Sequence, residues 1–201
     1  MTKYDWAPGM PFLPQYEGGR SFPQVFSAPI DGPASSVPAF TDDTIFAPNK
    51  RGLFQLVAVL DSVGHLSAVR ADIAQIKSSG PLSVLNPSEA TYIVHGASGA
   101  PRVDTLPDEE AIPHNIIRVL GTEEYTATGR TDEAMAKSFP RPPPLFYDPN
   151  RIRKDLGRDK VYIIVRWDRF VFAACRNYSE LQHAVSLVET TIVGGSQIDK
   201  S

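Results

Sequence analysis

Apolar residues gather in short runs along the chain, and their spacing predicts most of its secondary structure. From Leu53 to Leu60 the sequence reads LFQLVAVL, a run that is typical of a strand buried on both faces. Apolar positions then recur at helical steps of three and four, at Leu66, Val69, Ile73 and Ile76. Gly80-Pro81 is expected to end that helix, and the β-branched run Ala90–His95 predicts a second strand. The chain therefore begins β-α-β.

The last third of the chain has the clearest pattern. Val161–Arg166 and Phe170–Cys175 are β-rich and flank a short polar turn, which predicts an antiparallel hairpin. A helix is expected next, with Leu181, Ala184, Val185, Val188 and Ile192 on its apolar face. Ser179 and Gln182 have the spacing of a capping box. A β-β-α ending after a β-α-β beginning is the order of a thioredoxin-like fold, although the pattern alone leaves other α/β folds open.

Proline and glycine set the organisation of the remaining chain. Their density in residues 1–50 excludes long helices and favours an extended strap that packs on the domain through its aromatic side chains, with a short strand at Gln24–Ser27. The proline-rich stretch at residues 139–150 is interpreted as an extended connector. At 201 residues and 42% hydrophobic, the chain suits one domain. We assign a strap to residues 1–50, a thioredoxin-like domain to 51–195 and a flexible tail to 196–201.

The charge balance limits the classes of partner. The chain has 20 basic and 23 acidic residues, so no net field favours nucleic acid or an anionic membrane. No apolar run approaches the roughly 18 residues that a membrane span needs. The amino terminus also lacks the basic start and apolar core of a signal peptide. We expect a soluble, cytoplasmic protein with no nucleic-acid and no membrane partner.

Several kinds of chemistry lack the residues that they need. A dithiol oxidoreductase uses two cysteines, whereas this chain has only Cys175, which we interpret as a small core residue. The four histidines, His65, His95, His114 and His183, fall too far apart to form a metal-ligand motif. There is no G-x-S-x-G elbow and no G-x-G-x-x-G dinucleotide motif. We therefore expect no metal and no cofactor.

Acid–base catalysis stays open, because it needs only one or two polar groups in an apolar pocket. Asp61 and His65 follow the first predicted strand, where they could share a proton. In the simpler interpretation, which we favour for each residue alone, Asp61 or Ser62 caps the next helix and His65 lies at the surface. His95 ends the second strand and Tyr125 lies in a polar segment. Asp61, His65, His95 and Tyr125 are the candidate catalytic residues.

Four further residues are candidates for substrate binding: Arg20, Tyr92, Arg166 and Trp167. The two arginines could bind a phenolate or an enolate, although an exposed arginine needs no such role. Strand alternation puts Tyr92 and His95 on opposite faces, so only one of them can face a given pocket. Trp167 offers an apolar face to a ring-shaped ligand, and packing against the strap is the favoured alternative.

Four segments resemble a known domain: residues 41–57 (TDDTIFAPNKRGLFQLV), 121–130 (GTEEYTATGR), 145–149 (LFYDP) and 165–176 (VRWDRFVFAACR). In them, and broadly from Pro23 to the last helix, the chain resembles the C-terminal thioredoxin-like domain of fungal FAD-dependent aromatic hydroxylases of the phenol 2-monooxygenase type. The hairpin turn of that family usually reads V-R-P-D, where this chain has Val165-Arg166-Trp167-Asp168. The resemblance implies a thioredoxin-like fold and, by analogy, a homodimer. It does not imply hydroxylation, because flavin and substrate belong to upstream domains in that family.

Two functions remain. The first is a cofactor-independent cyclase or isomerase that moves a proton on a phenolic, aromatic polyketide-type secondary metabolite. The second is a non-catalytic accessory or dimerisation protein. The enzyme calls for an enclosed apolar pocket that holds ionisable groups. The accessory protein calls for a filled interior and an exposed apolar patch.

Overall fold

The computed structural model describes residues 12–30, 39–76, 84–95, 115–122 and 147–194, with side chains of the last helix described to Val188. The strands are β1 (Phe26–Pro29), β2 (Ala39–Phe40), β3 (Phe54–Leu60), β4 (Thr91–Val94), β5 (Ile116–Val119), β6 (Tyr162–Arg166) and β7 (Val171–Cys175). The α-helices are α1 (Thr41–Ile45), α2 (Leu66–Ala74), α5 (Arg151–Leu156) and α6 (Tyr178–Gly194). Short 3₁₀ helices are η1 (Pro14–Tyr16), η2 (Val63–His65) and η3 (Pro87–Glu89). The expected helix end at Gly80-Pro81, most of the proline-rich connector and the C-terminal tail lie outside the described residues.

The strands form one mixed sheet in the order β2-β1-β5-β4-β3-β6-β7. β3, β4 and β5 run parallel to one another, whereas β6 is antiparallel to β3 and β7 is antiparallel to β6. On the other flank, β1 is antiparallel to β5, and β2 to β1. The carboxyl ends of the three parallel strands therefore meet at one edge of the sheet. The α/β class predicted from the sequence is confirmed.

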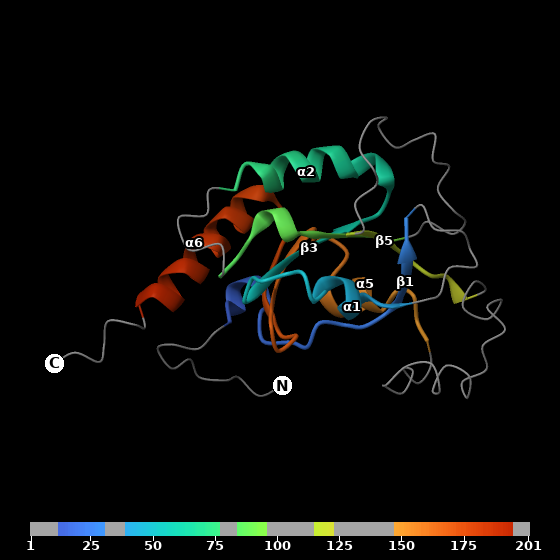
Figure 1. Ribbon diagram of the computed structural model, residues 1–201, viewed down its shortest axis with the longest axis horizontal. Coiled ribbons are helices and arrows are strands. Elements are labelled where there is room, and N and C mark those ends of the chain that lie inside the picture. Colours follow the sequence, from blue (N-terminus) through green and yellow to red (C-terminus); the bar gives the residue numbers. More distant parts are fainter. Residues whose placement is uncertain (1–11, 31–38, 77–83, 96–114, 123–146, 195–201) are drawn as a thin grey trace.

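Helices cover both faces of the sheet, as the apolar run of β3 predicts. All seven residues of β3 are buried. Alternation along the strand sends Leu56, Ala58 and Leu60 into a core with α2 and α6, while Val57 and Val59 pack with α1 and α5 on the other face. Figure 1 shows α2 and α6 above the sheet and α1 and α5 below it. The sheet is therefore the middle one of three layers, with helices on both of its faces.

The described part of the proline-rich N-terminal segment contributes to the sheet itself. A strand forms as predicted, but it starts at Phe26 rather than Gln24, and Ser27 pairs with Val119 of β5. It ends at Pro29, whose nitrogen has no proton to donate to a neighbouring strand. β2 and α1 follow on the same flank. These residues therefore add two strands to the sheet and a helix to the layer that contains α5. A strap that only packed on the outside of the domain would not contribute to the sheet.

The start of α6 differs from the predicted capping box at Ser179 and Gln182. Asn177 precedes the helix, and its side-chain Oδ1 accepts a hydrogen bond from the backbone N–H of Glu180 at 3.0 Å. The carboxylate of Glu180 in turn accepts from the backbone N–H of Arg176 at 2.8 Å. Asn177 thus caps the helix and Glu180 binds the backbone of the residue before it, because α6 begins two residues earlier than expected. The assignment to Ser179 is wrong.

The hairpin of β6 and β7 is confirmed, and so is the interpretation of Cys175. Its side chain is fully buried on β7, in the core under α6. Burial raises the pKa of the Cys175 thiol to about 12, so the thiol stays protonated at neutral pH. Cys175 fills space in the core.

Candidate functional site

Two of the predicted catalytic residues meet at the carboxyl edge of the parallel strands. Asp61 directly follows β3 and His95 directly follows β4, and the two strands are neighbours. The backbone N–H of His95 donates to the carbonyl oxygen of Leu60 at 2.6 Å, which holds the two strand ends together. We call this place, with the side chains of Asp61 and His95, the carboxyl-edge corner.

Arg153 of α5 occupies the same corner. Its guanidinium donates to Asp61 Oδ1 at 2.7 Å, to the carbonyl of Val59 at 3.1 Å and to the carbonyl of Lys160 at 2.6 Å. The Arg153 side chain is 8% exposed, whereas that of Asp61 is 67% exposed. A buried guanidinium that satisfies backbone carbonyls clamps the chain, and Asp61 is its counter-ion at the surface. The arrangement gives Asp61 a structural partner.

The imidazole of His95 is half-buried in this corner. Its Nε2 lies 2.9 Å from the carbonyl oxygen of Pro149, so Nε2 carries the proton that the carbonyl accepts. Burial lowers the pKa of His95, against the opposing effect of the Pro149 carbonyl, and the charge of Arg153 lowers it further. The ring is therefore neutral at neutral pH. His95 positions the chain that leads into α5.

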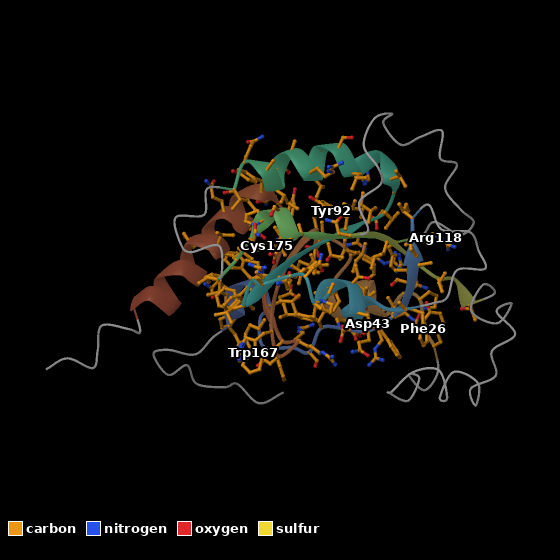
Figure 2. All side chains as sticks on the ribbon, viewed as in Figure 1. Phe26, Asp43, Tyr92, Arg118, Trp167 and Cys175 are labelled. Carbon is orange, nitrogen blue, oxygen red and sulfur yellow. The ribbon has the colours of Figure 1, made fainter. Side chains whose placement is uncertain are left out.

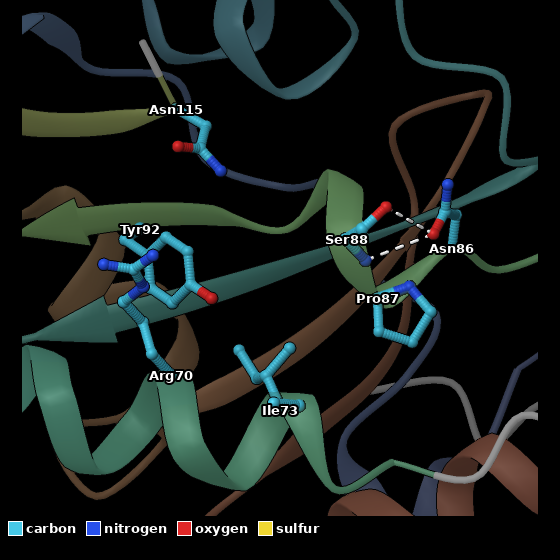
Figure 3. Close-up of a pocket in the computed structure, with 8 residues that line it drawn as sticks. Arg70, Ile73, Asn86, Pro87, Ser88, Tyr92 and Asn115 are labelled. Carbon is cyan, nitrogen blue, oxygen red and sulfur yellow. Dashed lines mark hydrogen bonds between the residues drawn. The ribbon is translucent and has the colours of Figure 1, made fainter. Parts of the chain in front are cut away.

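A half-open pocket of about 540 Å³ lies on the opposite face of the sheet, under α2 and at the amino ends of β4 and β5 (Figure 3). α2 provides one wall, η3 a second, and the sheet the floor. The lining residues are Arg70, Ile73, Ala74, Asn86, Pro87, Ser88, Tyr92 and Asn115. We call it the Tyr92 pocket. Its volume falls in the range of about 300–1,000 Å³ that small-molecule sites occupy.

Three polar groups give this pocket its chemistry. Burial raises the pKa of the Tyr92 hydroxyl, and the positive charge of Arg70 opposes that rise. Figure 3 shows the Arg70 side chain reaching from α2 toward Tyr92. Asn115 donates through Nδ2 to the carbonyl of Ala90 at 2.5 Å, and its buried Oδ1 has no hydrogen-bond partner among the residues that the structure describes. The pocket thus offers a cation and a phenolic donor, and Asn115 adds an amide that is bound to the backbone of Ala90.

A second tyrosine lies beside this pocket in the same row of the sheet. Ala58 of β3 pairs with Tyr92 on one side and with Tyr162 of β6 on the other, so both phenols lie on the α2 face. The Tyr162 hydroxyl donates to the carboxylate of Asp72 on α2. Burial raises the pKa of Tyr162, and the bond to Asp72 raises it further. This bond ties α2 to the sheet beneath the pocket.

The predicted residues do not form one site. Tyr92 faces α2 whereas His95 contacts the chain before α5, so their expected placement on opposite faces is confirmed. His65 is exposed at the end of η2. Within the described ranges, no side-chain hydrogen bond or ion pair joins His65 to Asp61 or His95. Tyr125 lies outside the described residues.

The other three substrate-binding candidates lie away from the Tyr92 pocket. Arg20 donates to the backbone carbonyl of Asp155 at 2.6 Å, on the α5 face. Arg166 pairs with Asp168 at 2.6 Å in the hairpin turn. Trp167 is 65% exposed, and Figure 2 shows it at the edge of the molecule opposite α2. Its packing against the strap stays a prediction, because residues 1–11 and 31–38 of the strap lie outside the described residues. Its position at the tip of a tight turn directs the indole away from the core.

Sequence reasoning missed Arg70, Asn115 and Arg153. Arg70 directly follows the buried Val69 and lies three residues before the buried Ile73, so it borders the apolar face of α2. This spacing could have indicated that Arg70 lies close to the sheet. Asn115 directly precedes β5, a position that a search for catalytic motifs does not weigh. Arg153 lies in a short helix without an apolar repeat long enough to predict. Their importance depends on contacts between distant segments.

The comparisons with known proteins add no relatives: no family model, no curated protein and no solved structure matches the chain. Among the residues that the structure describes, no group of three or more potential ligands is placed to hold a metal ion. In the same residues, no helix combines the length and the apolar character required to cross a bilayer.

Proposed function

We propose that the protein is a cofactor-independent cyclase or isomerase that binds a small phenolic metabolite of the aromatic polyketide type in the Tyr92 pocket. One observation carries the proposal: a cavity of about 540 Å³ that is lined by Arg70, by Tyr92 and by the apolar side chains of Ile73 and Pro87. Apolar walls suit a flat ring, and the guanidinium suits an oxygen that becomes negative during reaction.

The chemistry that fits these groups is an internal addition with no change in mass. A phenolic oxygen of the ligand attacks the β-carbon of an unsaturated carbonyl of the same molecule: the C–O bond forms, the carbon–carbon π bond breaks, and the phenolic proton passes to water at the open side of the pocket. The negative charge moves to the carbonyl oxygen, where Tyr92 donates a hydrogen bond and Arg70 supplies positive charge. The released proton then returns to the α-carbon, so atoms and electrons balance.

The raised pKa of Tyr92 suits its proposed role as a hydrogen-bond donor to the carbonyl oxygen of the ligand. A phenol that keeps its proton remains a donor throughout the reaction, and the neighbouring cation strengthens its bond to an oxyanion. Asp61, His65 and His95 lie at the other end of the parallel strands, away from this pocket. In the proposal, the oxyanion is held by Tyr92 and Arg70, and Tyr125 remains a predicted catalytic residue.

A test combines turnover with two matched variants. The purified protein is incubated, without any cofactor, with a panel of prenylated and unprenylated polycyclic phenols, and products are followed by chiral chromatography and mass spectrometry. We expect an enantioenriched product of unchanged mass, and a loss of about 100-fold in kcat for Tyr92→Phe and Arg70→Met. Tyr178→Phe and Arg158→Met are the controls, because both side chains lie outside the pocket. Equal losses in variants and controls contradict the site.

The accessory or dimerisation function is the second candidate, and one observation favours it. Leu53, Trp167 and Phe170 are the exposed large apolar side chains of the described residues, at 46%, 65% and 38%, and they lie together at the β6–β7 turn. Trp167 donates its backbone N–H to the carbonyl of Leu53 at 2.9 Å. A homodimer through this patch is tested by light scattering of the protein and of Trp167→Asp, which should shift a dimer to a monomer.

The thioredoxin-like fold and the relationship to the C-terminal domain of flavin-dependent aromatic hydroxylases belong to the same proposal. The topology supports the fold, and the relationship rests on the resemblance of the sequence segments. The elements β3-α2-β4 and β6-β7-α6 follow one another in the expected order, and their strands lie side by side as β4-β3-β6-β7. The inventory of one cysteine, buried on β7, separates the proposed protein from thiol oxidoreductases of that fold.

A further inference from the structure

A second, smaller pocket lies on the α5 face of the sheet, away from the Tyr92 pocket. Its volume is about 380 Å³, and it is bordered by the chain before β1, by α5 and by the β6–β7 turn. Phe22 and Pro23 are buried and give it an apolar base. Polar groups come from Ser21, Gln24, Arg151, Asp155 and Arg169. We call this hollow the arginine pocket.

Three arginines from three separate segments meet around it. Arg151 and Arg169 line the pocket, and Arg20 borders it by donating to the backbone carbonyl of Asp155, another lining residue, at 2.6 Å. Two carboxylates pair with them: Asp155 lies 3.5 Å from Arg151, and buried Asp42 lies 3.0 Å from Arg169. The three guanidinium groups thus outnumber these two carboxylates in a chain whose net charge is −3.

The backbone of Arg169 is an independent sign that this side chain is needed where it is. Its φ of 69° lies in the left-handed region, which glycine or asparagine usually occupies in a hairpin turn of this kind. The conformation is held by the carbonyl of Arg169, which accepts from the backbone N–H of Phe22 at 2.7 Å. An arginine kept at a strained position points to a function of its side chain.

The geometry points to an anion-binding site, and we propose that the arginine pocket binds a small oxyanion, in first place the carboxylate of an aromatic acid. A guanidinium binds a carboxylate or a phosphate through two parallel hydrogen bonds. The apolar base of Phe22 and Pro23 suits a ring attached to the anionic group. Phosphate shares the oxyanion chemistry, and the experiment separates the two sources. The site does not depend on the function of the Tyr92 pocket.

The bond that an incoming anion must replace is weak. Arg151 and Asp155 are each 49% exposed, and their charged atoms lie 3.5 Å apart. A ligand carboxylate competes with that of Asp155 for the same guanidinium. Removing the charge of Asp155 should therefore tighten anion binding, while the backbone carbonyl that holds Arg20 is retained. A purely structural role of Asp155 predicts no such gain.

The experiment measures binding of 4-hydroxybenzoate and of inorganic phosphate to the full chain by isothermal titration calorimetry, at constant ionic strength set with sodium chloride. We expect Arg151→Met and Arg20→Met each to weaken binding about tenfold, and Asp155→Asn to tighten it about threefold. The control pair is Arg176 and Asp159, which are similarly exposed and lie 2.9 Å apart elsewhere on the surface. Arg176→Met and Asp159→Asn should leave the affinity unchanged.

Each outcome decides the proposal. If 4-hydroxybenzoate binds and its affinity changes as expected in Arg151→Met, Arg20→Met and Asp155→Asn, an aromatic acid is supported as the ligand. If only phosphate binds, the oxyanion site is supported with phosphate as its ligand. Absence of binding for both probes, or equal losses in Arg151→Met and Arg176→Met, overturns it. Circular dichroism of each variant checks that the fold is retained, and Arg20→Met gives a second reading if Arg151→Met fails to fold.

Discussion

Arg153 of α5 and Asp61 after β3 form an ion pair at 2.7 Å between partners in unlike surroundings: the arginine side chain is 8% exposed and the aspartate 67%. The guanidinium also bonds the carbonyls of Val59 and Lys160. The two ends of this pair therefore contribute unequally. The exposed carboxylate is screened by water, whereas the buried guanidinium donates to backbone oxygens of two separate segments.

The first prediction tests that asymmetry. Arg153→Met should lower the free energy of unfolding by about 2–4 kcal/mol, because backbone carbonyls and the turn before β6 lose their donor. Asp61→Asn should cost below about 1 kcal/mol, since its partner keeps the other bonds. Urea denaturation of both variants measures the difference. Equal costs would show that Asp61 matters more than its exposure suggests, and would return it to the list of catalytic candidates.

Lys50 provides a pH-dependent prediction. Burial lowers the pKa of its amine from 10.5 to about 8, and the amine donates to the hydroxyl of Thr91. Between pH 8 and 10.5 the unfolded chain holds this proton and the folded chain does not, so stability rises with pH over that window. Because the side chain is only partly buried, we expect a gain of about 1–2 kcal/mol.

The measurement is urea denaturation at both ends of that pH window, in the unmodified protein and in Lys50→Met. The quantity of interest is the difference between the two proteins, because it isolates the contribution of Lys50. Lys50→Met should lack the part of the pH dependence that Lys50 contributes. Parallel pH profiles would mean that the amine keeps its ordinary pKa.

Periodicity predicted the central elements well, because burial on two faces leaves a direct trace in a sequence. β3 and the hairpin of β6 and β7 were placed within a residue or two, and the stripe of Leu66, Val69 and Ile73 does face the core. The cap of α6 was misplaced because Asn177 and Ser179 both suit such a position, and only the end of β7 decides between them. The local sequence is compatible with a cap at Asn177 or at Ser179, and the tertiary structure places it at Asn177.

The candidate sites were harder to predict, since they depend on which segments meet. The sequence grouped Asp61 with His65, whereas the structure brings Asp61 to His95 at the ends of the neighbouring strands β3 and β4. Arg153, which fills that corner, is separated from Asp61 by about ninety residues and carries no motif. Nothing in the spacing of Tyr92 indicates Arg70 or Asn115 beside it. Pairing of distant elements is the information that a single sequence lacks.

Cys175 should be unreactive in the folded protein. Its side chain is fully buried, and burial raises the pKa of the thiol to about 12, so neither access nor the thiolate form is available at neutral pH. Treatment with a disulfide reagent such as dithiobisnitrobenzoate at pH 8 should release no chromophore until denaturant is added. The rate should then follow global unfolding. Rapid labelling without denaturant would show that α6 opens away from β7 locally.

The bond between Tyr162 and Asp72 gives the last prediction. Tyr162→Phe removes the hydroxyl that joins β6 to α2, and we expect a loss of about 1–2 kcal/mol in the free energy of unfolding, because a charge-assisted bond in a partly buried place is lost. Tyr178→Phe is the matched control: its hydroxyl donates to the carbonyl of Gln75 at 3.2 Å in an exposed position, so its loss should cost below about 0.5 kcal/mol.

The pH dependence of the same bond has the opposite sign to that of Lys50. The pKa of Tyr162 is raised above its ordinary value of 10.0 in the folded protein, so the folded chain keeps a proton that the unfolded chain loses. Stability should therefore fall as the pH rises above about 10, and Tyr162→Phe should remove that part of the fall. Urea denaturation at pH 9 and pH 11 compares the two proteins. An unchanged slope in Tyr162→Phe would mean that Asp72 does not hold the phenol in its protonated form, and α2 would then be anchored by its apolar face alone.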